Sequence, residues 1–316
     1  MTTIERKNLP PAVFLMGPTA SGKTDLAVML SKAHPFEIIS VDSALIYKGM
    51  NIGTAKPEPQ VLAEAPHHLI DILDPSEPYS VADFRQDAIT LMTAITKRGH
   101  IPLLVGGTMM YFKVLCTGMA SMPSADNAVR QQLLDIAEEK GWPYLHQQLA
   151  EVDSEAAKRI KPMDTQRLQR ALEVYELTGK PLSELHREQN RQKLPWDITS
   201  LALSPEDRGI LHERIALRFQ LMLENGFLDE VKALYDRGDL SISMPAVRSV
   251  GYRQAWLYLK GELSYAEMVD KGIIATRQLA KRQLTWLRGW PDVHWLDSLS
   301  FSLEQDALKV LQPVLI

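Results

Sequence analysis

The sequence predicts an α/β fold, in which a parallel sheet is flanked by helices and interrupted by an all-helical insertion. Short apolar runs, AVFLM (12–16), EIISV (37–41) and IPLLVGG (101–107), alternate with segments of helical periodicity. A glycine-rich loop, GPTASGKT (17–24), joins the first run to a helix. Strand-like runs largely vanish between residues 124 and 190. Because parallel strands place their carboxyl ends at one edge, we expect the segments that follow them to meet there.

Three segments follow from this pattern. Residues 1–123 form the first part of the α/β core, and residues 124–190 form the helical insertion. Residues 191–316 return to the core, starting with the run ITSLALS (198–204), and carry a basic helix near the C-terminus.

Helix boundaries are marked by capping residues. In the insertion, Asp126 and Asp164 are predicted to cap two helices, which end at Gly141 and Gly179. After the insertion, Ser204 in the run SPED is predicted to cap a long helix, with the following proline in its first turn.

The composition is that of an ordinary globular protein, with 45% hydrophobic and 23% charged residues among 316. The single cysteine, Cys116, excludes an internal disulfide, and no Cys/His cluster has zinc spacing. No stretch near the N-terminus is apolar and long enough to cross a bilayer. We therefore expect a cytoplasmic protein with no membrane segment, and we expect a monomer.

The loop GPTASGKT matches the pattern G-x-x-x-x-G-K-[ST] between a strand and a helix. Its amides and the helix N-terminus favour phosphate, Lys23 neutralises phosphate charge, and Thr24 is suited to ligate magnesium. This is typical of nucleotide-binding, ATP-binding proteins and predicts a P-loop NTPase-like fold. A glycine turn that only packs is the alternative, and it leaves the lysine without a role. The predicted phosphate site comprises Gly17, Pro18, Thr19, Ala20, Ser21, Gly22, Lys23 and Thr24.

Asp42 begins the loop after the second apolar run. A lone aspartate there is commonly a helix cap or a turn former. Beside a phosphate loop, it is also suited to hold an acceptor hydroxyl, as in small-molecule kinases, or to accept a proton from an attacking amine. The residues by themselves leave these alternatives open.

Two further segments supply candidate residues. Gly106 and Gly107 permit close backbone approach, and Thr108 presents a hydroxyl at the strand end, although a simple tight turn is an alternative. Arg214 and Arg218 lie four residues apart, hence on one helix face. They are suited to clamp a diphosphate or to pair with neighbouring acids at the surface.

The formal net charge of −4 gives no overall sign of nucleic-acid binding. However, residues 271–290 hold no acid, two interleaved Trp and five bases. A solvated helix face and a surface for stacking and phosphate contact both fit this pattern. The bases are Lys271, Arg277, Lys281, Arg282 and Arg288.

Five motifs together carry a resemblance that covers essentially residues 9–296. They are GPTASGKT, SVDSALIYKGMNIGTAKP (40–57), GGTMMYF (106–112), AVRSVGYRQ (246–254) and ATRQLAKRQLTWLRG (275–289). With these motifs the chain closely resembles the bacterial tRNA dimethylallyltransferases, the isopentenyl-diphosphate:tRNA isopentenyltransferase family. Ordinary P-loop kinases lack the second motif and the basic helix.

The resemblance implies a prenyltransferase of tRNA modification. The loop would hold dimethylallyl diphosphate with magnesium, and the acceptor would be the exocyclic amine of the adenosine at tRNA position 37, immediately 3′ of the anticodon. The products would be isopentenyladenosine and diphosphate. Asp42 would act as the base, Thr108 would orient the amine, and Lys23, Thr24 and Arg218 would stabilise the leaving group.

The resemblance also implies contacts with the tRNA anticodon stem-loop. They would come from Asp42, Ser43, Ala44, Leu45, Thr108, Arg130, Gln166, Arg167, Leu168, Gln169, Arg170, Val247, Arg248, Ser249, Val250, Gly251, Tyr252, Ala280, Lys281, Arg282, Gln283, Leu284, Thr285, Trp286 and Leu287. For residues 247–252, ordinary packing is a strong alternative.

Two rival functions remain open at this stage. A P-loop small-molecule kinase would use ATP, with Asp42 as the base and the insertion as a lid carrying arginines. A nucleotide-switched RNA-binding module would account less well for Asp42.

Overall fold

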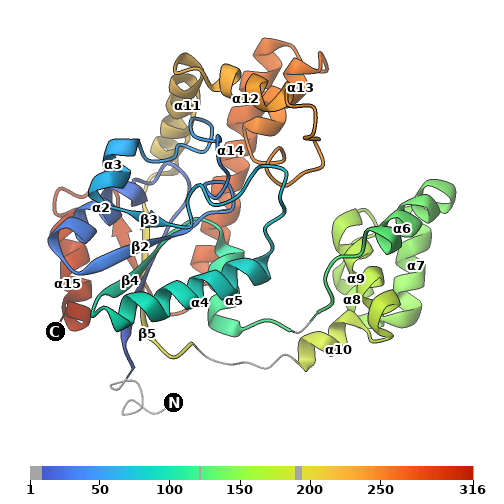
Figure 1. Ribbon diagram of the computed structural model, residues 1–316, viewed down its shortest axis with the longest axis horizontal. Coiled ribbons are helices and arrows are strands. Elements are labelled where there is room, and N and C mark those ends of the chain that lie inside the picture. The colour runs from blue at the N-terminus through green and yellow to red at the C-terminus, as the bar shows by residue number, and fades with distance from the viewer. Residues whose placement is uncertain (1–8, 121, 189–193, 316) are drawn as a thin grey trace. The chain divides into compact units, whose positions relative to one another are not determined.

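The computed structural model describes residues 9–120, 122–188 and 194–315. The chain divides into two compact units, one formed by Met1–Leu115 with Leu194–Ile316 and the other by Cys116–Lys193 (Figure 1). The insertion expected at 124–190 lies inside the second unit.

The first unit is built on a six-stranded sheet in the order β3-β2-β4-β1-β5-β6. Every neighbouring pair is parallel. The predicted α/β fold with a parallel sheet is confirmed, although the sequence analysis had not identified the two edge strands. The strands are β1 (Pro11–Met16), β2 (Phe36–Val41), β3 (His67–His68), β4 (Ile101–Gly106), β5 (Asp197–Ser204) and β6 (Val293–Asp297).

Helices cover both faces of this sheet (Figure 1). On one face, Leu15 of β1 belongs to a buried cluster with Leu26 of α2 (Lys23–Ala33) and Leu311 of α15 (Leu303–Leu315). On the other face, the Phe14 ring lies 5.0 Å from the Phe112 ring of α5 (Met109–Thr117), with centroids as reference points. Alternate residues of β1 therefore point to opposite layers, as the pleat of a strand requires. The remaining helices of this unit are α3 (Pro59–Glu64), α4 (Val81–Lys97), α11 (Arg208–Glu224), α12 (Phe227–Tyr235), α13 (Tyr252–Leu259) and α14 (Tyr265–Arg288).

A second buried cluster joins the segment after β2 to the helices α11 to α14. Ile46, Tyr47 and Met50 are almost completely buried against Phe227 and Tyr252. The segment 42–57 is therefore held by packing along its length, rather than hanging free from the sheet edge. None of the helices in the described ranges is apolar over a length that would cross a membrane.

The start of α11 differs from the prediction. Asp207 caps the helix, accepting a hydrogen bond from the Gly209 amide at 2.7 Å. Ser204 is instead the last residue of β5, and its hydroxyl donates to the Pro205 carbonyl. The predicted Ser204 cap is wrong because Ser204 is paired with Asp297 of β6, which keeps its backbone extended.

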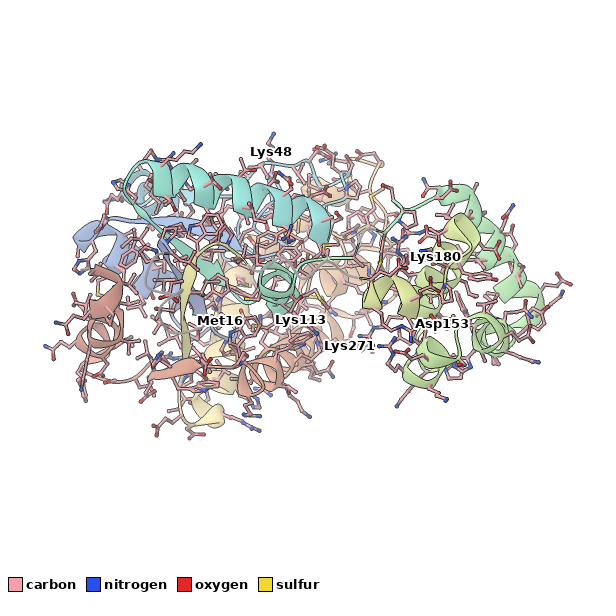
Figure 2. The ribbon with its side chains drawn as sticks, turned by 90° about the horizontal axis from the view of Figure 1, so that it is seen from below. Met16, Lys48, Lys113, Asp153, Lys180 and Lys271 are labelled. Atoms are coloured by element: carbon pink, nitrogen blue, oxygen red, sulfur yellow. The ribbon has the colours of Figure 1, made fainter. Side chains whose placement is uncertain are left out.

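Among the described residues of the second unit, helices are the only regular elements, and short loops join them. Asp126 and Asp164 cap helices as predicted, with their carboxylates accepting amide hydrogen bonds, and Gly179 ends the second of these helices in a left-handed conformation. Asp153, seen among the helices in Figure 2, is buried and accepts the amides of two helices. The helices are α6 (Asn127–Lys140), α7 (Trp142–Val152), α8 (Ser154–Arg159), α9 (Thr165–Thr178) and α10 (Leu182–Arg187).

Candidate active site

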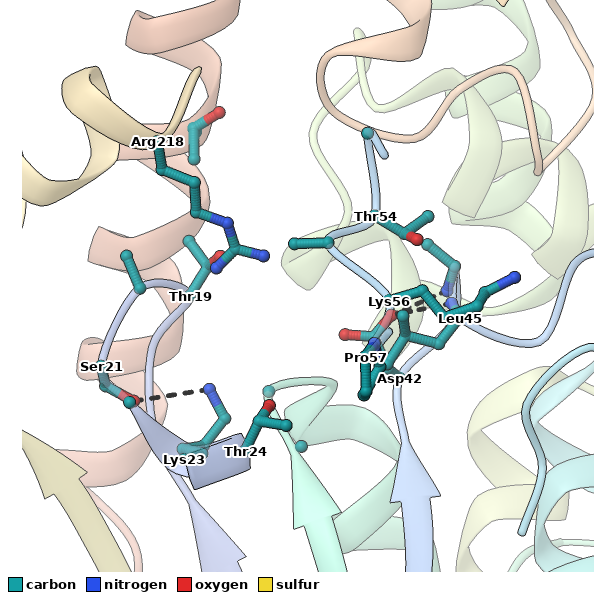
Figure 3. A pocket seen from close by; sticks show the side chains of 18 of the residues that line it. Thr19, Ser21, Lys23, Thr24, Asp42, Leu45, Thr54, Lys56, Pro57 and Arg218 are labelled. Carbon is teal, nitrogen blue, oxygen red and sulfur yellow. Dashed lines mark hydrogen bonds between the residues drawn. The ribbon is translucent and has the colours of Figure 1, made fainter. Parts of the chain in front are cut away.

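A cavity of about 780 Å³ opens at the carboxyl edge of the sheet. The phosphate loop after β1 lines it, together with Asp42 after β2, Gly107 after β4 and Arg218 of α11. Figure 3 shows Lys23 and Thr24 facing this space, with Asp42 on its other side. The fold therefore brings together groups that the sequence placed far apart.

The phosphate loop turns into α2 through Gly22, whose φ of 87° is readily adopted only by glycine. The Lys23 ammonium folds back over the loop, where it donates to the Pro18 carbonyl at 2.7 Å and lies 3.5 Å from the Ser21 hydroxyl. Thr24 stays exposed at the start of the helix. The Lys23 ammonium and the exposed Thr24 hydroxyl therefore lie at the N-terminus of α2, where the helix dipole favours an anion.

Two cations at this site are poorly solvated. Burial lowers the pKa of Lys23 to about 8, with nearby Asp42 opposing the change and Arg218 adding to it. Burial likewise lowers the pKa of Arg218, and the carboxylates of Asp42 and Asp25 oppose this. Desolvated cations of this kind gain strongly when a polyanion arrives, because each regains a charged partner in a low-dielectric environment.

Asp42 combines a turn-forming role with an available oxygen. Its Oδ1 accepts hydrogen bonds from the Ala44 amide at 2.8 Å and the Leu45 amide at 3.3 Å. No described residue donates to its second oxygen, Oδ2. Next to it, Thr108 Oγ1 accepts from the Ser43 amide at 3.1 Å. Thr108 therefore joins the end of β4 to the Asp42 turn and does not line the cavity itself.

Glu230 of α12 holds the middle of segment 42–57 and was missed by the sequence analysis. Its Oε2 accepts the amides of Asn51 at 2.7 Å and Ile52 at 2.8 Å. Its Oε1 accepts the Gly53 amide at 3.1 Å and the Tyr252 hydroxyl at 2.5 Å. In the sequence this glutamate looks like any acid in a helix, because nothing local shows what it contacts.

Lys56 holds the end of the same segment. Its buried ammonium donates to the Tyr47 carbonyl and to the Asn51 side-chain oxygen, each at 2.9 Å, and pairs with Asp71. The motif SVDSALIYKGMNIGTAKP contains this lysine, but no role was predicted for it from the sequence. The two anchors of opposite charge, Glu230 and Lys56, give the segment a defined shape along one wall of the cavity.

The basic helix α14 exposes four bases, of which Lys271 is paired with Glu267. Lys281, Arg282 and Arg288 are exposed, and none of them forms an ion pair with a described carboxylate. Thr285 is exposed as well, and the half-buried Trp286 ring lies 5.2 Å from the Lys113 ammonium. Lys113, on α5, extends the row of positive charge beyond α14.

Several side chains in the ranges expected to contact tRNA are buried instead. Five of them, Leu168, Val247, Ala280, Leu284 and Leu287, pack in the protein interior and are poorly placed for a side-chain contact with tRNA. Gly251, Tyr252 and Gln283 are also buried, but they line the cavity. Local sequence similarity marks a range but does not show which of its residues point inward. The buried residues are Leu168, Val247, Gly251, Tyr252, Ala280, Gln283, Leu284 and Leu287.

Other residues of those ranges do reach a surface or the cavity. Ser43 and Arg248 are exposed. Ala44, Leu45, Ser249 and Val250 line the cavity.

In the helical unit, Arg130 and Arg170 both pair with Glu173, whose side chain is completely buried. This structural role was not foreseen for either arginine. Gln169 donates to the Arg130 carbonyl at 3.0 Å. By contrast, the Arg167 side chain is 75% exposed, and its contact with Asp164 is a surface ion pair, which is weak. Together with the exposed Gln166, Arg167 is the better placed of these residues for an external phosphate.

The residues of the cavity fit a magnesium ion that is bound jointly with a substrate. Within the described residues, no three His, Cys, Asp or Glu side chains are grouped to hold a metal. Magnesium commonly keeps several waters and takes phosphate oxygens with one or two protein oxygens. The exposed Thr24 hydroxyl at the cavity wall supplies one such protein oxygen.

The parallel sheet and the phosphate loop place the chain in the class of P-loop α/β proteins. The family model described as IPP transferase matches residues 45–290, and the one described as isopentenyl transferase matches residues 11–71. The chain belongs to the IPP transferase family, that of the tRNA dimethylallyltransferases.

Individual relatives agree with this membership. The chain is 55% identical to tRNA dimethylallyltransferase 2 of Hahella chejuensis, over 97% of this chain and 96% of that protein. The tRNA isopentenylpyrophosphate transferase of Bacillus halodurans is 37% identical, with a TM-score of 0.68 over 96% of this chain and 94% of that one. A eukaryotic dimethylallyltransferase acting on tRNA is 29% identical, with a TM-score of 0.80 over 95% of this chain and 78% of that one.

Proposed function

We propose that this enzyme transfers the dimethylallyl group of dimethylallyl diphosphate to the exocyclic amine of the adenosine 3′ of a tRNA anticodon. One observation carries the proposal. Desolvated cations, a carboxylate and apolar side chains line a single cavity. The apolar side chains that suit a five-carbon unit are Phe219, Met222 and Leu279.

The leaving group is the diphosphate. As the allylic C–O bond breaks, its electron pair goes to the bridging oxygen, and negative charge grows on the diphosphate. Lys23 and Arg218 offset this charge, and the phosphate-loop amides hold its oxygens. A magnesium ion held through Thr24 would supply further charge stabilisation.

The nucleophile is an aromatic amine whose lone pair is delocalised into the adenine ring. A new C–N bond forms at the allylic carbon as the C–O bond breaks, and the amine must lose one proton. Asp42 Oδ2 accepts that proton, because Oδ1 is already occupied by the amides of Ala44 and Leu45. The Thr108 hydroxyl contributes indirectly, because its hydrogen bond with the Ser43 amide fixes the turn that carries Asp42.

The tRNA has to present an unstacked base to this recessed cavity, and unpaired loop bases lose little by leaving the stack. The exposed bases Lys281, Arg282 and Arg288 on α14 are suited to backbone phosphates of the stem. The exposed Arg167 on the helical unit adds a further phosphate contact.

A small-molecule kinase accounts less well for the same features. The kinase hypothesis needs arginines of the insertion free to close over ATP phosphates. Two of the described arginines there, Arg130 and Arg170, are held by the buried carboxylate of Glu173. The relatives of the chain are also tRNA dimethylallyltransferases and tRNA isopentenylpyrophosphate transferases.

The test is a transfer assay with unmodified tRNA. The protein is incubated with magnesium and with dimethylallyl diphosphate labelled in its allyl carbons, or with ATP or GTP labelled in the terminal phosphate. We expect allyl label alone to enter the RNA, as a modified adenosine visible by mass spectrometry after nuclease digestion. A tRNA with guanosine at that position is the control and stays unlabelled. Transfer of phosphate label, or no allyl transfer, would overturn the proposal.

A further inference from the structure

Gln283 lies on the basic helix α14, yet its side chain is only 8% exposed. Its Oε1 accepts a hydrogen bond from the Thr19 amide of the phosphate loop at 2.9 Å. Its Nε2 donates to the Gly107 carbonyl at the end of β4 at 3.0 Å. An amide donor needs the oxygen end and a carbonyl needs the nitrogen end, so these two partners define one orientation of the side chain.

The fit around this side chain is close. A Cβ atom added at Gly107 would lie 2.2 Å from Gln283 Nε2, so only glycine leaves room for it. Because Thr19 and Gly107 both belong to the sheet edge, Gln283 ties two strand ends to one helix. The hydrogen bond to Gly107 is buried and the one from Thr19 is partly buried. Loss of the side-chain amide would therefore leave the Gly107 carbonyl without its partner away from water.

The two partners of Gln283 lie in or next to the two groups that act in the proposed reaction, the phosphate loop and the Asp42 turn. Thr19 lies in the loop that holds the diphosphate. Gly107 precedes Thr108, which in turn binds the Ser43 amide beside Asp42. On the same helix, the residues directly before Gln283, Lys281 and Arg282, are exposed to an external partner.

We infer that Gln283 is a positioning residue that couples tRNA binding on α14 to diphosphate binding in the phosphate loop. A polyanion bound to Lys281 and Arg282 restricts the movement of this turn of α14. Because Gln283 lies on the same turn, its two hydrogen bonds then hold the Thr19 amide and the Gly107 carbonyl in fixed positions. By linkage, the diphosphate also strengthens tRNA binding by the same factor. This inference rests on the proposed function and adds a route between its two substrates.

The test measures binding and does not depend on catalysis. Inorganic diphosphate with magnesium is titrated into the full chain by calorimetry, without RNA and with a saturating unmodified anticodon stem-loop. Q283M keeps the length of the side chain but removes both hydrogen bonds. Q283E keeps an acceptor for Thr19 and loses the donor to Gly107. Q278M, at an exposed position of the same helix, is the matched control.

For the wild type and Q278M we expect RNA to raise diphosphate affinity by at least about fivefold. In Q283M the ratio of diphosphate affinity with RNA to that without RNA should fall close to one. Its diphosphate affinity without RNA should also drop by about fivefold or more relative to the wild type. Q283E should lose the coupling as well, and it carries the test if Q283M does not fold. A ratio near one in the wild type, or an unchanged ratio in the folded Q283 variants, would overturn the inference. Allyl transfer by the wild type is scored separately, so a failure of the proposed function stays distinguishable.

Discussion

The Thr108 hydroxyl oxygen accepts a hydrogen bond from the Ser43 amide at 3.1 Å, which joins the ends of β4 and β2. Asp42 directly precedes Ser43, and its Oδ1 is held by the Ala44 amide at 2.8 Å. The proposed base is therefore fixed by its own turn and by the neighbouring strand end. A general base with a fixed position is effective because little ordering remains to be done in the transition state.

We predict that D42N slows allyl transfer by on the order of a hundredfold or more, because it removes the proton acceptor. The asparagine oxygen can still accept the amides of Ala44 and Leu45, so the turn should persist. tRNA affinity should stay within a few-fold of the wild type in a filter-binding assay. Near-normal single-turnover transfer by D42N would mean that Asp42 serves as a turn former alone.

We predict that T24A impairs transfer strongly and raises the magnesium concentration needed for half-maximal rate. T24S should restore most of the activity, because the serine hydroxyl offers the same ligand. Excess chelator should abolish transfer by the wild type, and added magnesium should recover it. Full activity in excess chelator would exclude a role for the metal.

We predict that affinity for dimethylallyl diphosphate falls as pH rises above about 8, by up to about tenfold per unit. The Lys23 pKa is about 8 in the free protein. A bound diphosphate favours the charged ammonium, so above that pH binding must add a proton to Lys23. K23M should bind dimethylallyl diphosphate weakly. Any remaining change of its affinity with pH should come from protonation of the ligand alone. Calorimetry in buffers of different ionisation enthalpy measures the proton uptake, and none at pH 9 would contradict this.

The same pKa has a consequence for stability. The folded-state value of about 8 lies below the ordinary value of 10.5. Between these two pH values the unfolded chain holds a proton on this lysine that the folded chain has lost. The contribution of Lys23 to the free energy of unfolding therefore rises with pH across that window and is constant below it.

We predict that K281A, R282A and R288A each weaken tRNA binding and flatten its salt dependence, by about one unit of slope per lost phosphate contact at most. These bases are exposed and unpaired with any described carboxylate, so they are available to phosphates. K271A is the matched control, since Lys271 lies 3.7 Å from Glu267 on the same helix. Plots of tRNA affinity against salt concentration that are parallel and have equal intercepts for all four variants would show that these bases are only solvated and do not bind tRNA.

We predict that E230Q lowers stability by about 3 kcal/mol, which for a unit of the size of the first one means roughly 6–12 °C in Tm. The glutamine nitrogen would face donors, because Glu230 accepts from three amides and the Tyr252 hydroxyl. E224Q changes an exposed glutamate on α11 and should leave Tm unchanged. Equal melting curves for E230Q and the wild type would show that Glu230 does not anchor the segment.

Local patterns in the sequence determined the elements and the core of the site. The apolar runs predicted the central strands, because the pattern of a buried strand can be recognised within a few consecutive residues. The caps Asp126 and Asp164 were readable for the same reason. The phosphate loop was predictable because its glycines, Lys23 and Thr24 are contiguous and act together.

The tertiary structure alone decided which distant residues meet. Gln283 and Thr19 are 264 residues apart, and Glu230 reaches Asn51 across 179. Which face of a helix meets a loop depends on how the layers pack, and no local period encodes this. Ser204 shows the same limit, since its sequence context favoured a cap until pairing with β6 held it in the sheet. Side chains that act through partners far along the chain therefore became visible only once the chain was folded.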